Sequence, residues 1–62
     1  MELEILRLYT DMSDQLEFIN IVKNKAQNAV GSCQASLVVY YCKQLSGLVD
    51  DLKSMALEAE KN

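Results

Sequence analysis

The stretch VGSCQASLVVYYCKQL, residues 30–45, joins a helix-breaking signal to a run of residues that favour β-strands. Gly31 and Gly47 are the two glycines of this 62-residue chain, which contains no proline. Glycine commonly ends a helix in the left-handed conformation, and serine is a favoured N-cap for the next helix. The pair Gly31-Ser32 therefore predicts the boundary between two helices.

The run from Leu37 to Tyr41 has high β propensity, but propensity is a weak guide that context overrides. A half-buried strand would show alternation of apolar and polar residues, and this run shows none. Val38, Tyr41 and Cys42 instead begin a helical repeat that continues to Ala59. We therefore interpret the run as the first turns of a second helix.

Apolar residues on both sides of the boundary recur at heptad spacing, which predicts helices at about residues 2–30 and 33–60. They form three lines along each helix. The first line contains Ile5, Met12, Ile19 and Ala26, and then Val38, Leu45, Leu52 and Ala59. The second line, three residues further on, contains Leu8, Val22 and Ala29, and then Tyr41, Leu48 and Met55. The third line, four residues further on, contains Tyr9, Leu16 and Val30, and then Cys42, Val49 and Ala56.

A two-residue connection makes the helices antiparallel, so the predicted fold is an all-α helical hairpin forming one domain, residues 1–62. In this hairpin the first lines pair in register, with Ala26 opposite Val38 and Ile5 opposite Ala59. An alternative helix boundary lies at Thr10–Ser13, where Ser13 resembles an N-cap.

Three apolar lines are too many for a single seam between two helices. A short chain buries little surface alone and commonly relies on disulfides, a metal or self-association. Cys33 and Cys42 lie nine residues apart, too far for a disulfide within one helix, and we expect both to be reduced thiols. We therefore expect two hairpins to dimerise into a four-helix bundle.

Charge is segregated along the sequence. Residues 1–22 carry five acids and one arginine, residues 23–49 carry three lysines and no acid, and residues 50–62 carry four acids and two lysines. Folding the hairpin places the positive segment at the turn and the negative segments at the open end. Two copies then attract best with their turns at opposite ends, as an antiparallel two-fold homodimer.

The composition argues against several classes of function. The chain has no histidine, no Gly-rich phosphate loop and no nucleophile elbow, so we expect no enzyme, no cofactor and no metal site. The start lacks the features of a secretory signal and no run is long enough to span a bilayer, so we expect no membrane association and a cytoplasmic location. A net charge of −3 makes nucleic-acid binding improbable.

Two polar residues interrupt the lines of the first helix, Gln15 in the second and Lys23 in the third. One interpretation is a polar core layer that sets register or oligomeric state. The other, which we favour, is that Gln15 lies at the edge of the stripe and the Lys23 side chain extends to water.

Of the apolar residues outside the three lines, Leu3, Leu6 and Leu57 lie towards the open end, and the others cluster towards the turn. We predict that these residues either widen the dimer interface or receive another protein: Phe18, Ile21, Leu37, Val39 and Tyr40. The expected function is a small interaction or regulatory protein that acts by binding another protein. A structural subunit of a hetero-oligomeric helical complex and an RNA-binding hairpin dimer are the alternatives.

Overall fold

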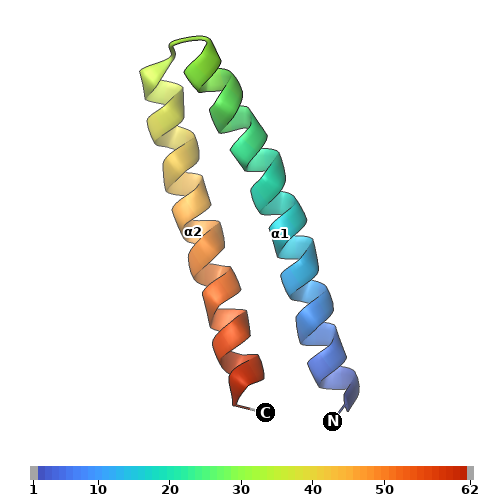
Figure 1. Ribbon diagram of the computed structural model, residues 1–62. Coiled ribbons are helices and arrows are strands. Elements are labelled where there is room, and N and C mark those ends of the chain that lie inside the picture. Colours follow the sequence, from blue (N-terminus) through green and yellow to red (C-terminus); the bar gives the residue numbers. More distant parts are fainter. Residues whose placement is uncertain (1, 62) are drawn as a thin grey trace.

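The computed structural model describes residues 2–61 and shows two long helices side by side (Figure 1). Helix α1 spans Glu2–Gly31 and helix α2 spans Ala35–Glu60, and they run antiparallel with both chain ends at the same end. Residues 2–61 contain no strand. The prediction of an all-α hairpin, including the helical assignment of Leu37 to Tyr41, is confirmed.

Helix α1 continues without interruption through Thr10–Ser13, so the alternative boundary at these residues is wrong. The Thr10 hydroxyl donates a hydrogen bond of 3.0 Å to the Leu6 carbonyl oxygen one turn earlier. Such a bond back into the preceding turn is compatible with an α-helix and occupies the hydroxyl that would otherwise compete with the helix.

The turn differs from the predicted Gly31-Ser32 break. Gly31 is the last residue of α1 and has no positive φ, whereas Cys33 has a φ of 55°. The amide of Gln34 donates to the Ala29 carbonyl at 2.9 Å, and the amide of Cys33 donates to the Val30 carbonyl at 3.1 Å. These two bonds define a Schellman motif with Cys33 in the left-handed position, two residues later than the glycine.

The second helix also begins two residues later than predicted, at Ala35 instead of residue 33. Its N-cap is Gln34, whose carbonyl accepts bonds from the amides of Leu37 and Val38 at 3.0 and 3.1 Å. The Gln34 side chain makes no capping bond. Ser32 is therefore not the N-cap, because the Schellman motif extends through Gln34 and delays the helix start.

The seam between the helices is formed by the first two predicted lines. Among residues 3–61, whose burial the structure describes, Val22 and Ala29 are the two that are buried, at 5% and 3% exposure. The other members of these lines are half-buried, whereas every described member of the third line is exposed. One helix pair thus covers two lines and leaves the third uncovered.

The hairpin is thin for its mass, with principal extents of 48 × 15 × 10 Å and a radius of gyration of 14.4 Å. A compact chain of this length would have a radius of gyration of about 11 Å. The accessible surface is 4927 Å². A compact monomer of 7.0 kDa would expose about 4,000 Å². The hairpin therefore keeps about 900 Å² more surface than folding alone normally leaves.

Candidate protein-interaction surfaces

The third line forms an exposed apolar strip along one side of the seam. Because the helices are antiparallel, the strip contains residues of α1 and of α2. We call it the Leu16 face, and it comprises Tyr9, Leu16, Lys23, Val30, Cys42, Val49 and Ala56. Lys23 is its one charged residue among those that the structure describes. A strip this long and this poor in charge resembles the core of an interface more than an ordinary protein surface.

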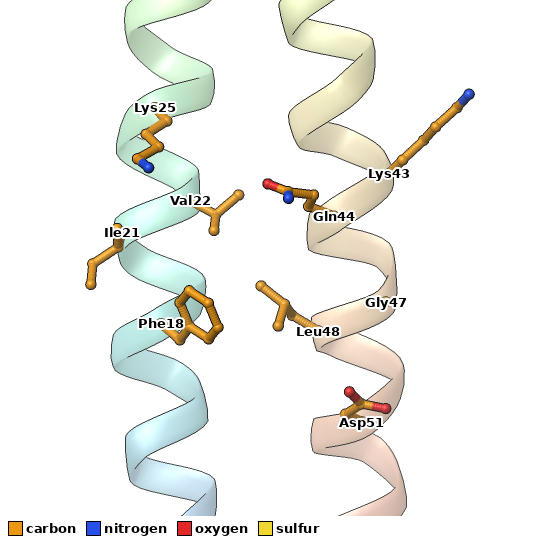
Figure 2. Close-up of a pocket in the computed structure, with 9 residues that line it drawn as sticks. All are labelled: Phe18, Ile21, Val22, Lys25, Lys43, Gln44, Gly47, Leu48 and Asp51. Atoms are coloured by element: carbon orange, nitrogen blue, oxygen red, sulfur yellow. The ribbon is translucent and has the colours of Figure 1, made fainter.

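A groove of about 610 Å³ lies between the helices on the opposite side of the seam (Figure 2). We call it the Phe18 groove. Its lining residues are Phe18, Ile21, Val22, Lys25, Lys43, Gln44, Gly47, Leu48 and Asp51. Val22, Gln44 and Leu48 point into the space between the helices (Figure 2). The Phe18 ring lies over α1 beside this space, and Ile21 and Lys43 point away from it (Figure 2). Gly47 contributes no side chain, which leaves the α2 wall open at that level.

Four of the five predicted patch residues lie on the side of the Phe18 groove. Phe18 and Ile21 line the groove itself. Leu37 lines a smaller adjoining hollow of about 250 Å³, and Lys25 belongs to both. The Tyr40 hydroxyl accepts a hydrogen bond of 3.2 Å from the side-chain amide of the groove residue Gln44.

The fifth residue, Val39, lies apart from the other four. It lines a hollow at the turn together with Val30, Cys33 and Val38. Val30 belongs to the Leu16 face, so Val39 extends that face instead of the groove. The sequence pattern grouped the five residues by their place along the chain, but the antiparallel geometry divides them between two sides.

Sequence reasoning missed the polar residues that complete the groove. Lys25, Gln44 and Asp51 lie one residue before a first-line position, where Phe18 and Leu37 also lie. In an antiparallel pair these positions face each other across the seam. The position of Lys25, Gln44 and Asp51 in the heptad repeat could therefore have predicted that they lie beside Phe18 and Leu37. Lys25 stands in the turn half of the groove and Asp51 nearer the open end.

Gln15 lies in the seam and not at its edge. Its side-chain amide nitrogen donates a hydrogen bond of 3.0 Å to the Leu48 carbonyl oxygen on the facing helix. Lys23 is exposed, as favoured from the sequence. The two interruptions therefore differ: Gln15 makes a half-buried cross-helix contact, and Lys23 lies on the Leu16 face.

The described residues 2–61 hold no group of three or more carboxylates and thiols placed to bind a metal ion. Within the same residues, neither helix combines the length and the apolar character needed to cross a membrane. Cys33 and Cys42 are both exposed and unpaired thiols.

Comparisons with known protein families, with curated proteins and with solved structures found no match to this chain.

Proposed function

We propose that this chain is a small, non-enzymatic interaction protein that acts as a homodimer of helical hairpins and binds another protein. The surface excess supports this proposal most strongly. The excess of about 900 Å² per chain is close to the roughly 800 Å² that each partner contributes to a standard protein–protein interface.

The two exposed surfaces suit two different roles. The Leu16 face is long, apolar and nearly free of charge, as expected for a permanent contact. The Phe18 groove has an apolar floor with polar and charged groups at its edges, which is typical of a site that is sometimes open to solvent. We assign partner binding to the groove, with Phe18, Ile21, Leu37 and Tyr40 as its apolar contacts. Two exposed reduced thiols suit the cytoplasm as the compartment.

Partner binding is tested by affinity capture from the native host. Wild-type bait should enrich a specific protein, and the Phe18→Ser and Tyr40→Ser variants should lose it. Phe18 is 52% exposed in the free hairpin, so its replacement should leave the helical content unchanged. Circular dichroism of each bait verifies this.

Leu57→Ser is the matched control. Leu57 is also a large apolar residue, 48% exposed, but it lines neither the groove nor the two hollows. The control should retain the captured protein. Capture that survives both groove substitutions would contradict the assignment of the groove.

A structural subunit of a hetero-oligomer is the second candidate, because the same surface excess fits a different chain completing the bundle. This candidate predicts that the purified chain is monomeric and poorly helical. Light scattering combined with circular dichroism distinguishes it from the homodimer.

A further inference from the structure

We propose that a second copy of this chain covers the Leu16 face, packed about a two-fold axis that places the two turns at opposite ends. The inference rests on the proposed function and specifies the face, the orientation and the register of its homodimer. The Phe18 groove then stays on the outside of the bundle.

Charge distinguishes the two sides of the hairpin. The Leu16 face carries Lys23 as its one charged residue among those described. The Phe18 groove is lined by Lys25, Lys43 and Asp51. Interface cores are depleted in charge, so the Leu16 face is the better site for a permanent contact with another chain.

The occupant of this face has to be about as long as the hairpin and has to complement its charge. The Leu16 face runs from Tyr9 to Val30 on α1 and from Cys42 to Ala56 on α2, most of a 48 Å molecule. A second copy has this length and offers the same unpaired apolar strip. The area also agrees, because the surface excess of about 900 Å² per copy is close to the roughly 800 Å² that each partner buries in a standard interface.

The segregated charges select the orientation. The three lysines of residues 23–49 lie in the turn half, and most acids lie towards the open end. Turns at opposite ends bring each positive half against a negative half, whereas turns at the same end bring like charges together. A two-fold axis that exchanges the ends runs across both helices. Helix α1 therefore packs on the second copy's α1, and α2 on its α2.

The axis passes near Leu16 and Val49. Leu16 lies at the middle of α1, and Val49 lies close to the middle of α2. Both are exposed third-line residues, so each would contact its own symmetry mate at the centre of the dimer. The Gln15–Leu48 hydrogen bond occurs at the same level of the hairpin.

The same axis gives Lys23 a partner. Tyr9 and Lys23 each lie seven residues from Leu16, about 10 Å along the helix in opposite directions. The second copy's Tyr9 therefore lies at the level of Lys23. There the face of the tyrosine ring can contact the lysine ammonium group, and the lysine aliphatic chain can pack against the ring. On α2, Cys42 comes to the level of the second copy's Ala56, so two small residues meet.

The face is tested by a pair of charge substitutions, Leu16→Glu and Ile21→Glu. The two side chains are equally exposed in the hairpin, at 53% each, and both lie on α1. Leu16→Glu places two carboxylates together at the axis and should weaken dimerisation by at least about 100-fold. Ile21→Glu lies on the groove side and should leave the mass at twice 7.0 kDa in sedimentation equilibrium.

The orientation is tested by disulfide cross-linking in a background with Cys33→Ser and Cys42→Ser. With turns at opposite ends, Leu16→Cys alone should form a covalent dimer under mild oxidation, and a mixture of Tyr9→Cys and Lys23→Cys should form a mixed one. Tyr9→Cys alone should not cross-link, because its two copies lie about 20 Å apart along the helices, well beyond disulfide reach. These cysteines replace exposed residues, so they keep the test valid if Leu16→Glu fails to fold.

Each outcome has a distinct meaning. A dimeric wild type that loses its dimer on Leu16→Glu but not on Ile21→Glu, and that cross-links through position 16, supports the inference. A wild-type dimer that cross-links through Leu16→Cys paired with Val49→Cys, but not through Leu16→Cys alone, has its turns together and overturns the orientation. A dimer disrupted by Ile21→Glu alone overturns the face and the assignment of the groove to another protein, while the homodimer itself stands. A stable wild-type monomer overturns both.

Discussion

The side-chain amide of Gln15 donates a 3.0 Å hydrogen bond to the backbone carbonyl of Leu48, which joins the two helices near the middle of the hairpin. This contact agrees with the predicted register within one residue, since the pairing of Ala26 with Val38 and of Ile5 with Ala59 places Gln15 opposite Val49. A half-buried polar group in an otherwise apolar seam costs stability but penalises other alignments, in which the amide would lose its acceptor.

Replacing Gln15 with leucine should separate these two effects. We expect Gln15→Leu to raise the free energy of unfolding by about 1 kcal/mol per chain, because an apolar side chain replaces a partly desolvated amide. The alignment of α1 with α2 should become less specific at the same time. Urea unfolding measures the first effect, and the number of sets of amide signals in the NMR spectrum measures the second, with one set for a single alignment and more for several.

Gln15→Ala is the control for this prediction. It removes the hydrogen bond and leaves a void, so the free energy of unfolding should fall by about 1–2 kcal/mol. A Gln15→Leu variant that is less stable than the wild type would show that the hydrogen bond outweighs the burial of apolar surface.

The turn offers a second prediction, because its left-handed position is occupied by Cys33 instead of glycine. A residue with a Cβ atom is strained there by about 1–2 kcal/mol, and part of this is offset by the greater freedom of glycine in the unfolded chain. We expect Cys33→Gly to raise the free energy of unfolding by about 0.5–1 kcal/mol, measured by urea unfolding at fixed protein concentration.

Gly31→Ala also tests whether Cys33, and not Gly31, occupies the left-handed position of the turn. Gly31 is the last residue of α1, it has no positive φ, and an added Cβ would meet no atom within 4 Å. Alanine should therefore stabilise the chain by up to about 1 kcal/mol. If Gly31 were the left-handed residue, as its place in the sequence first indicated, the substitution would destabilise the chain instead.

The sequence predicted the parts of the fold that depend on repeated apolar residues. Heptad spacing predicts both helices and the antiparallel hairpin. It also predicts that the line containing Ile19 and Leu45 faces the other helix. The sequence predicts the turn two residues too early, because Gly31 strongly favours the left-handed position and nothing in the local sequence marks Cys33 as its substitute. The side of the hairpin on which Val39 lies depends on the pairing of two distant segments, so its separation from Phe18 became evident only in three dimensions.

The two thiols provide a test that needs no substitution. Both are exposed in the free hairpin, but Cys42 lies on the Leu16 face and Cys33 lies in the turn. In the proposed dimer, Cys42 should react with a thiol reagent at least about 10-fold more slowly than Cys33, because reactivity follows access. Mass spectrometry after timed alkylation measures both rates in one sample. Equal rates in a dimeric sample would mean that Cys42 remains open to solvent and that another face forms the contact.

The central claim is that one hairpin is too thin to remain folded without covering its exposed apolar line. Sedimentation equilibrium of the purified wild-type chain, with circular dichroism recorded at each concentration, tests it most directly. We predict a mass of twice 7.0 kDa and a helical signal that decreases on dilution together with the dimer. A stable, fully helical species of 7.0 kDa in dilute solution would contradict the claim.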